Sequence, residues 1–270
     1  MDYLFIGPFS FYNMNDSTQY FIDTHCHLDF SRIGKIETVL AQSTDVGVNQ
    51  FIVPSVDGSN WQKTLDLSSK FANIHCGLGV HPHFLKDDNQ LQQLTELATV
   101  HRENIVAIGE IGLDGVIDSP QHIQVDVLTQ QLALAKMLEL PVICHGHKAL
   151  DILLKYLRLY QLPKGGVIHG FSGSIIQASE FIKLGFYIGI GGVITYERAQ
   201  KTRRTVAQLP LEALLLETDS PDMPVNGFQG QVNFPKRIPI IAQHLSDLHN
   251  TSVDFIAEIT TTNAKQLFEI

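Results

Sequence analysis

The sequence of 270 residues predicts a single α/β domain, a TIM-type (β/α)8 barrel, regular or distorted. Two observations lead to this fold class. Short apolar, β-branched runs recur eight times, and segments with helical periodicity separate most of them. Such alternation is typical of parallel βα units, and eight units in about 250 residues suit a barrel. A doubly wound sheet is the weaker alternative, because no glycine-rich phosphate turn follows the first run.

The eight predicted strands leave room for a helix after nearly every one. In chain order the strands are residues 20–25, 50–55, 74–80, 105–110, 141–145, 166–169, 186–190 and 213–218. The predicted helices between them are residues 34–47, 60–72, 91–103, 122–140, 148–160 and 174–185. Between the last two strands, residues 195–205 form a further helix-like stretch that could cap the barrel mouth.

Composition sets limits on the class of protein. No linker or low-complexity tract divides the chain, so residues 21–270 are expected to form one domain after an N-terminal extension of residues 1–20. The net charge of −9 gives no general attraction to nucleic acid, so a polyanionic substrate would need local cations or metal. Three cysteines without a paired spacing, no signal peptide and no membrane-spanning run predict a cytoplasmic protein with no membrane partner. No obligate protein partner is inferred.

Ionisable side chains gather at the C-terminal ends of the predicted strands. They are His25, His27, His81, His83, Glu110, Asp114, His145, His147, His169, Asp219 and Asp222. All strands of a parallel barrel end at the same mouth, where active sites form. The pattern therefore predicts that these side chains converge on one site.

The first of these groups is a histidine pair around a cysteine. Residues two apart on a strand face the same side, so His25 and His27 can both point into the barrel while Cys26 points outwards. Alone, this pair would suit a structural role as well as a ligand role, but the other ionisable residues favour ligands. Cys26, Cys76 and Cys144 are expected to be buried, unreactive thiols.

Four imidazoles and two carboxylates exceed what one tetrahedral metal ion needs. A carboxylate from a middle strand can bridge two ions, so the set predicts a two-metal centre. Two such cations lower the pKa of a bridging water and stabilise both oxygens of a displacement, as in phosphoester hydrolysis. An aspartate on the last strand could bind one ion and accept the proton of the water. Zn²⁺, Mn²⁺, Ni²⁺ and Mg²⁺ all remain candidates for the ions.

The chain resembles the TatD family of metal-dependent deoxyribonucleases, which belongs to the amidohydrolase-like barrels. The matching stretches are DTHCHLDF (23–30), GVHPH (79–83), GEIGLD (109–114), PVICH (141–145), IHGFSG (168–173), LLLETDSPDMP (214–224) and NGFQGQ (226–231). Each stretch alone is moderately specific, and the ordered set is strongly specific.

The resemblance implies a role for each matching ionisable residue. His25, His27 and Asp219 would bind one metal ion, Glu110 would bridge, and His145 and His169 would bind the second. Asp219 would also be the general base, which makes it a catalytic residue together with Glu110. His81 would contact the substrate; a structural role beside Pro82 is the alternative.

Two positions depart from the family pattern, both among expected substrate contacts. Many relatives carry an aromatic residue where this chain has Gly115, and an arginine where it has His147, a weaker phosphate partner. The loop 170–173 could bring backbone close to a phosphate or form a plain turn. A cationic rim for a polyanion, or a solvated helix face, could be formed by Arg198, Lys201, Arg203 and Arg204. Stacking on a base, or packing under their loop, are the two roles considered for Phe228 and Phe234.

The leading hypothesis is a metal-dependent deoxyribonuclease that removes nucleotides from an accessible 3′ end, with single-stranded DNA or a 3′ end as its substrate. One alternative is an ester or amide hydrolase of the same superfamily, such as an aminoacyl-ester hydrolase acting on RNA. Many amidohydrolase barrels bridge their metals with a modified lysine on the fourth strand, and Glu110 at that position favours the TatD type. The other alternative, a non-catalytic binding scaffold, predicts decay among the ligands, yet all six positions are filled.

Overall fold

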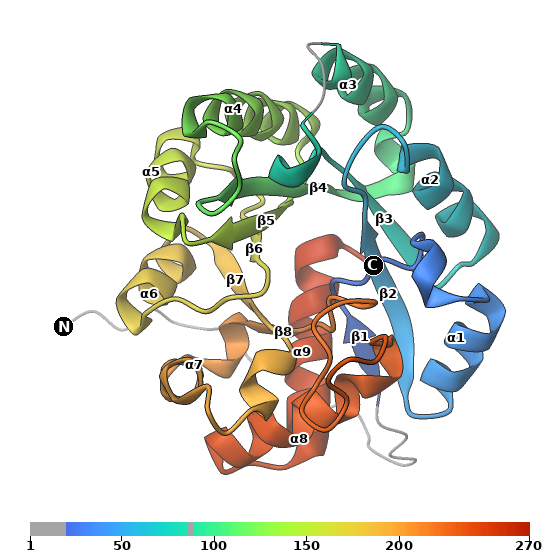
Figure 1. Cartoon of the computed structure of the whole chain (residues 1–270), viewed down its shortest axis with the longest axis vertical. Helices are drawn as coiled ribbons and strands as arrows, with labels where there is room; N and C mark the ends of the chain where they lie inside the picture. Colours follow the sequence, from blue (N-terminus) through green and yellow to red (C-terminus); the bar gives the residue numbers. More distant parts are fainter. Residues whose placement is uncertain (1–19, 86–88) are drawn as a thin grey trace, which may run out of the picture.

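Eight parallel strands form one sheet, whose neighbours follow the order of the chain (Figure 1). The computed structural model describes residues 20–85 and 89–270. The strands are β1 Phe21–Asp23, β2 Val48–Pro54, β3 Ile74–Leu78, β4 Ile105–Asp114, β5 Val142–His147, β6 Gly166–Ile168, β7 Phe186–Ile190 and β8 Leu214–Leu216. Each lies within or overlaps the apolar run that predicted it, and the single-domain TIM-type barrel is confirmed. The predicted N-terminal extension lies outside the described residues, except for Tyr20.

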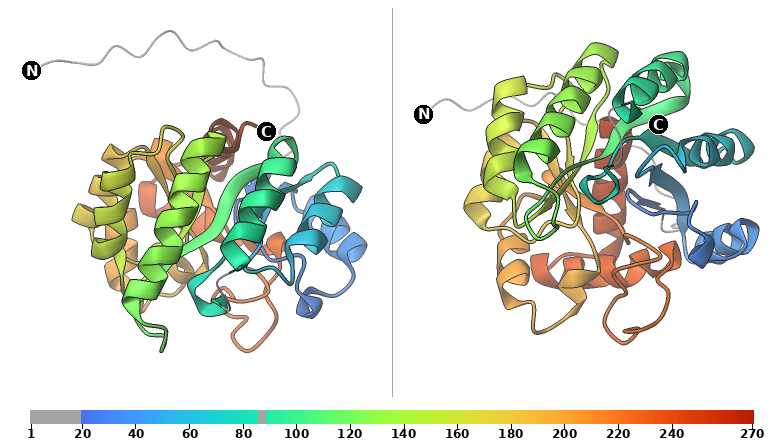
Figure 2. Two further views of the ribbon diagram at one scale, coloured as in Figure 1. Left: turned by 90° about the horizontal axis from the view of Figure 1, so that it is seen from above. Right: turned by 45° about the horizontal axis from the view of Figure 1, so that its top comes forward.

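Helices follow the strands and surround the sheet (Figures 1 and 2). The α-helices are α1 Ile36–Thr44, α2 Trp61–Lys70, α3 Gln90–Val100, α4 Gln121–Leu138, α5 Leu150–Tyr160, α6 Ile175–Lys183, α7 Gln200–Val206, α8 Ile238–His249 and α9 Val253–Phe268. Short 3-10 helices are η1 Ser31–Ile33, η2 Pro82–Phe84, η3 Arg102–Asn104, η4 Gly192–Thr195, η5 Leu211–Ala213 and η6 Pro235–Arg237. The helix expected over residues 195–205 is shorter, because the backbone is extended at Tyr196 between η4 and α7. None of the helices in the described residues is long and apolar enough to cross a bilayer.

Two hydrophobic cores lie on the two faces of the sheet. The larger core packs strand side chains such as Phe51 and Leu78 against helix side chains such as Leu128 and Leu132. Cys26, Cys76 and Cys144 are free and buried in this outer core, as predicted. The inner core combines inward strand residues with the last turns of α9. Because Thr261 of α9 donates to the Tyr20 carbonyl just before β1, α9 covers the N-terminal end of the barrel.

The barrel closes through an irregular seam between β8 and β1. Backbone hydrogen bonds cross it from Thr24 to the Leu216 carbonyl at 3.0 Å and from Asp219 to the His25 carbonyl at 2.9 Å. An isolated parallel bridge joins Cys26 and Ser220. This seam accounts for the distortion that the sequence left open, and predicted site residues lie on both sides of it.

Strand β4 contains one residue more than its neighbour accommodates. In the pairing with β5, Gly109 lies opposite Ile143 and Ile111 lies opposite Cys144, so that Glu110 has no partner. Beyond this bulge Asp114 lies opposite His147. Because a bulge shifts the alternation of side chains by one, Glu110 can face the barrel together with residues further along the strand.

Candidate metal centre

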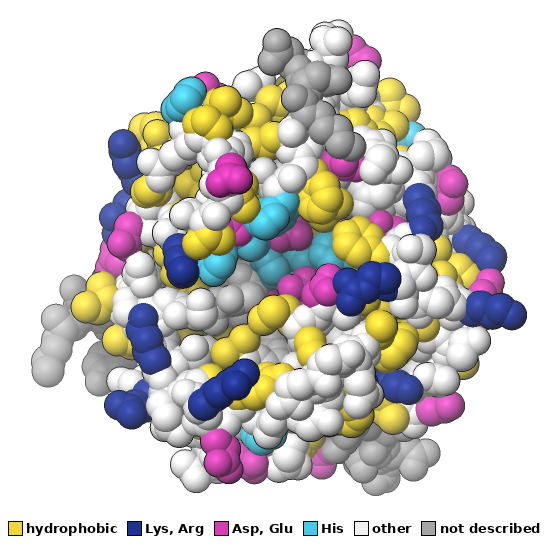
Figure 3. Space-filling view, in the orientation of Figure 1, with side chains coloured by type: hydrophobic (Ala, Val, Ile, Leu, Met, Phe, Trp, Pro, Cys, Tyr) yellow, Lys and Arg dark blue, Asp and Glu magenta, His cyan; other side chains and the backbone are white. Residues whose placement is uncertain are grey.

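The C-terminal ends of the strands surround a hollow on one face of the molecule. Figure 3 shows histidine and acidic side chains in this hollow, with Lys and Arg side chains spread around its rim. The predicted ligands lie here, since His25 and Glu110 are nearly fully buried and Asp219 keeps a quarter of its side chain exposed. The structure thus brings together residues that are almost 200 positions apart in the chain.

Glu110 lies at the centre of the cluster, with each carboxylate oxygen facing a different set of residues. On one side, Oε2 lies 3.3 Å from Nε2 of His25 and 3.7 Å from Nε2 of His27. The same two nitrogens lie 3.7 Å and 3.5 Å from Oδ1 of Asp219. This first set is supplied by the β8–β1 seam and by β4.

The second set faces Oε1 of Glu110. His169 approaches this oxygen with Nε2 at 2.8 Å, and His145 approaches it with Nδ1 at 3.4 Å. The two imidazole nitrogens lie 3.3 Å apart. The six predicted ligands therefore form two sets that share Glu110.

The spacing within the sets suits metal ligands. Two nitrogens bound to one tetrahedral zinc ion lie about 3.3 Å apart, and Nε2 of His25 and Nε2 of His27 are separated by 3.3 Å. His27 directs its other nitrogen, Nδ1, at the Pro54 carbonyl 3.2 Å away. The carbonyl requires a proton on Nδ1, so the lone pair of the neutral ring is on Nε2. The residues present therefore fit a cation between them.

His81 contacts the same carboxylate with a different protonation pattern. Its Nδ1 accepts a hydrogen bond from the backbone N–H of His83 at 3.1 Å, so a neutral His81 carries its proton on Nε2. That Nε2 lies 3.3 Å from Oε1 of Glu110. His81 is therefore arranged as a hydrogen-bond donor beside the two sets, and it has no lone pair to offer a metal ion from that nitrogen.

Glu217 is a site residue that sequence reasoning missed. Its buried Oε1 accepts a hydrogen bond from the Gly170 N–H at 2.5 Å and lies 3.7 Å from Nδ1 of His169. A carboxylate behind a ligating histidine fixes the ring's orientation and tautomer. The signal was available, because Glu217 directly precedes Thr218 and Asp219 at the end of the last predicted strand.

The charged groups of the cluster shift one another's pKa values strongly. Burial alone would raise the pKa of Glu110, but the imidazoles of His81, His169 and His25 outweigh it and hold the pKa well below the ordinary value. Burial also opposes ionisation of Asp219, yet the hydrogen bond from His27 and nearby histidines lower its pKa. Burial lowers the pKa of His27, but Asp219 and Glu110 reverse the effect and raise it to about 9. Both carboxylates therefore stay ionised at neutral pH.

Asp219 has an unusual backbone conformation. Its φ of 55° lies in the left-handed region, which residues other than glycine adopt at a cost of order 1 kcal/mol. Backbone hydrogen bonds hold it there, including the one from its own N–H to the His25 carbonyl. Such conformations concentrate at functional sites. The constrained turn directs the Asp219 carboxylate at the histidine pair on the other side of the seam.

His147, a predicted substrate contact, lies further out and does not join the two sets. Its Nδ1 is 3.3 Å from Oδ2 of Asp114, which also lies 2.9 Å from Nε2 of His83 and 3.0 Å from Nε2 of His145. Asp114 is buried, while His83 and His147 are nearly half exposed. A second carboxylate of β4 is thus also contacted by several imidazoles.

The second departure from the family pattern, Gly115, has a steric reason. A Cβ at this position would lie 2.8 Å from the carbonyl oxygen of Lys148. Lys148 has a φ of 50°, and the Gly115 N–H donates to the His147 carbonyl at 2.8 Å. An aromatic residue would require this loop to shift.

A cavity of about 440 Å³ adjoins the mouth beside His147, and Lys148, Ser172 and Lys201 are among its lining residues. Of the four basic residues predicted for a rim, Lys201 lines this cavity. Arg198 instead stacks over the Tyr196 ring, and the Arg203 guanidinium donates to the Ile194 carbonyl. The backbone N–H of Gly170, in the predicted phosphate loop, is occupied by Glu217.

The two loop phenylalanines pack onto the protein. Phe228 and Phe234 are half-buried against the outer core, and the Arg237 guanidinium lies 4.0 Å from the centre of the Phe228 ring. Packing under the loop, the second of the two roles considered for them, describes their positions.

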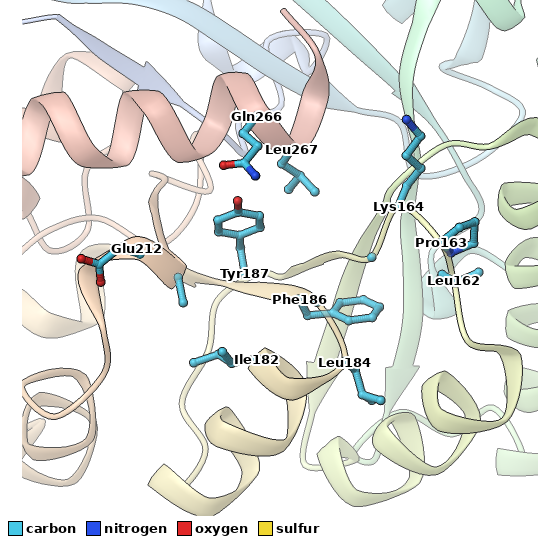
Figure 4. Close-up of a pocket in the computed structure, with 13 residues that line it drawn as sticks. Leu162, Pro163, Lys164, Ile182, Leu184, Phe186, Tyr187, Glu212, Gln266 and Leu267 are labelled. Atoms are coloured by element: carbon cyan, nitrogen blue, oxygen red, sulfur yellow. The ribbon is translucent and has the colours of Figure 1, made fainter. Parts of the chain in front are cut away.

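A different cavity, of about 330 Å³, lies at the opposite end of the barrel. Figure 4 shows Lys164, Tyr187 and Glu212 around it, near the first residues of β6, β7 and β8. No residue of the two ligand sets lines this cavity. The two ligand sets therefore lie at the C-terminal mouth, away from this cavity.

Comparison with known proteins agrees with the fold and identifies the family. Residues 22–269 match the family model described as "TatD related DNase". The protein named uncharacterized metal-dependent hydrolase YjjV from Escherichia coli K12 is 44% identical over 254 residues, which cover 93% of this chain and 98% of that protein. A metal-dependent hydrolase of Haemophilus influenzae, also named uncharacterized, is 40% identical and covers 92% of this chain and 99% of its own.

Solved structures give the same result. The crystal structure of Escherichia coli YjjV, described as a TatD homologue, superposes with a TM-score of 0.90 over 93% of this chain and 98% of that one, at 44% identity. A TatD family hydrolase of Entamoeba histolytica shares the fold, with a TM-score of 0.82 at 22% identity, and covers 93% of this chain and 98% of its own. With a family model matching nearly the whole described domain, the chain belongs to the TatD family of metal-dependent hydrolases.

Proposed function

We propose that this protein hydrolyses DNA phosphodiester bonds from a 3′ end, with two divalent metal ions at the cluster around Glu110. His25, His27 and Asp219 would hold one ion, His145 and His169 the other, and Glu110 both. The observation that carries this assignment is the arrangement of six donors in two sets that share one carboxylate, with imidazole nitrogens 3.3 Å apart in each set. Zn²⁺, Mn²⁺, Ni²⁺ and Mg²⁺ are the candidates for the ions.

When bound, the two ions would lower the pKa of a water and stabilise charge on the phosphodiester oxygens. The residues of the chain supply the remaining functions. Asp219 is ionised and partly exposed, so its carboxylate can take the proton of the attacking water. The Nε2–H of His81 can donate to a phosphate oxygen. Glu217 places a buried negative charge 3.7 Å from Nδ1 of His169, on the side of the ring away from Nε2.

Three features support DNA as the substrate. The matching family model is described as "TatD related DNase". The catalytic groups lie in a hollow at the barrel mouth, which suits a strand end better than the middle of a duplex. Lys148 and Lys201 line the adjoining cavity and supply local positive charge that can offset the net charge of −9.

The test uses single-stranded DNA labelled at the 3′ or the 5′ end. Metal-stripped protein is resupplied separately with Mg²⁺, Mn²⁺, Zn²⁺ or Ni²⁺, beside Glu110→Gln and the distant control Glu212→Gln, which lies at the other end of the barrel. We expect early, metal-dependent release of the 3′ label by the wild-type protein and the control. If no metal supports cleavage although the ions bind, the DNA assignment is wrong; an aminoacyl-RNA ester is then the next substrate to assay.

A further inference from the structure

The imidazole contacts of Asp114 form a second cluster, which shares only His145 with the proposed metal centre. Three imidazole nitrogens meet at a single oxygen, Oδ2, at 2.9 Å for His83, 3.0 Å for His145 and 3.3 Å for His147. The histidines come from the loop after β3 and from β5, so three separate segments supply the cluster together with β4. A carboxylate oxygen carries two lone pairs, which is fewer than the nitrogens around it.

Of the three imidazoles, His145 is explained by the metal centre. Its Nδ1 faces Glu110 and His169, and its Nε2 faces Asp114. A carboxylate behind a metal-ligating histidine is the usual way to orient the ring. His83 and His147 have no such explanation, because their ring nitrogens contact Asp114 rather than Glu110. Their imidazoles converge on Asp114 from the solvent side.

Asp114 is held rigidly for this purpose. Its other oxygen, Oδ1, accepts a hydrogen bond from the Val116 N–H at 2.9 Å. Its backbone N–H and carbonyl both bond the side chain of Gln124 on α4, at 2.8 and 3.0 Å. Oδ2 is thus the oxygen that faces the imidazoles, and its position is set before any ligand arrives.

Accessibility, and the distance of each of the two histidines from Asp114, suit a cation at this position. The side chains of His83 and His147 are 45% and 47% exposed, so an ion can reach them from solvent. Nitrogen and oxygen ligands about 2.05 Å from a metal ion are separated by about 2.9 to 3.3 Å when they subtend angles of about 90 to 110°. The distances from Oδ2 to the two nitrogens, 2.9 and 3.3 Å, match this range.

We propose that His83, Asp114 and His147 form a third divalent-cation site, through Nε2, Oδ2 and Nδ1 respectively. Two imidazoles and one carboxylate favour a borderline transition metal such as Zn²⁺ over Ca²⁺. Three protein ligands leave coordination positions that water or a phosphate oxygen of a substrate can fill. The site stands beside the two-metal function and does not depend on which substrate is cleaved.

The test counts bound ions rather than turnover. Metal-stripped protein is titrated with Zn²⁺ against a competing chelator, and the ions per chain are measured by mass spectrometry. We expect three for the wild-type protein and two for both His83→Gln and His147→Arg, since a guanidinium has no lone pair to bind a metal. His122→Gln, on the exposed surface of α4, is the matched control and keeps three.

Location is checked by anomalous scattering at the zinc edge from crystals grown with Zn²⁺, where a third peak is expected between His83, Asp114 and His147. An equal number of ions in wild type, His83→Gln and His147→Arg overturns the proposal and identifies the contacts as hydrogen bonds alone. Glu110→Gln separates the two proposals. If the third site is real, the anomalous peak at Asp114 remains in this variant. If the two-metal assignment is wrong, only the number of peaks around Glu110 differs from the expected two.

Discussion

Strand β4 carries two carboxylates, Glu110 and Asp114, and imidazoles contact both of them, but the two surroundings differ. Both oxygens of Glu110 are used, each by its own set of ligands, and its histidine partners are mostly buried. Asp114 directs one oxygen at its histidines, and two of those rings are nearly half exposed. Glu110, the inner carboxylate, divides its contacts between its two oxygens, whereas Asp114, the outer carboxylate, concentrates its histidine contacts on Oδ2. The groups around them are called the inner and the outer cluster.

The difference shows how depth selects the role of such a cluster. Burying ionised groups is costly unless they are paired, so a buried cluster with this many titratable groups depends strongly on its complete set of partners. Near solvent, water can satisfy an imidazole, and the loss of one partner costs little. We therefore expect changes at the inner cluster to have larger effects than equivalent changes at the outer one.

Glu110→Gln is expected to have the largest effect. The amide keeps the shape of the side chain but removes the charge that both ligand sets share. Losing about 4 kcal/mol of transition-state stabilisation lowers kcat/KM about 1000-fold. The measurement is the rate of metal-dependent hydrolysis beside Glu212→Gln, and activity within tenfold of wild type would show that Glu110 is not shared by two ions.

Glu217→Gln sharpens the comparison, because this buried carboxylate lies behind the inner cluster only. Its amide can still accept the Gly170 N–H bond, but it loses the charge beside Nδ1 of His169. Metal affinity is expected to fall by about 10- to 100-fold. Competitive chelator titration measures this fall. An unchanged affinity together with a lower melting temperature would assign Glu217 a purely structural role.

Metal binding at the inner cluster should depend on pH through His27. With its pKa raised to about 9, the ring carries a proton on Nε2 at pH 7, and this proton must leave before the nitrogen can bind a metal ion. Release of this proton alone makes the apparent affinity fall about tenfold for each pH unit below 9. His169 steepens the fall, because Glu110 outweighs burial and raises the pKa of that ring well above its ordinary value. Calorimetry in buffers of different ionisation enthalpy counts the released proton, and a count of zero at pH 7 would contradict the raised pKa.

The smallest effect is expected from the thiols, two of which, Cys26 and Cys144, adjoin cluster histidines in the sequence. Cys26 and Cys144 are fully buried, and burial raises the pKa of Cys76 to about 11, so about one in 1000 Cys76 side chains is a thiolate at pH 8. Unfolded protein should react with three equivalents of a thiol reagent per chain, and native protein should not react on the same timescale. Fast modification that also removes activity would place a cysteine among the ligands.

The sequence predicted the barrel because its strands are apolar and its helices are periodic, and both properties are local. It also predicted which residues reach the mouth, since strand ends meet there. It gave no sign that Asp114 gathers three histidines, because those contacts depend on register and side-chain direction. Glu217 stood out only by its place just before Thr218 and Asp219, and its position behind His169 also depends on side-chain direction. The roles of Phe228 and Phe234 stayed undecided for the same reason: packing and stacking need the same residue type.

The unpaired Glu110 in the β4–β5 ladder has a consequence for how the family can vary. Beyond the bulge, every residue of β4 faces the side opposite to the one it would face in a regular strand. Deleting one residue near position 110 would move Leu113 into the mouth and turn Asp114 towards the helices. A substitution here alters one side chain, but a one-residue insertion or deletion turns every later side chain of β4 to the opposite face of the sheet. Any alignment that places a gap at this point exchanges the two faces of the strand.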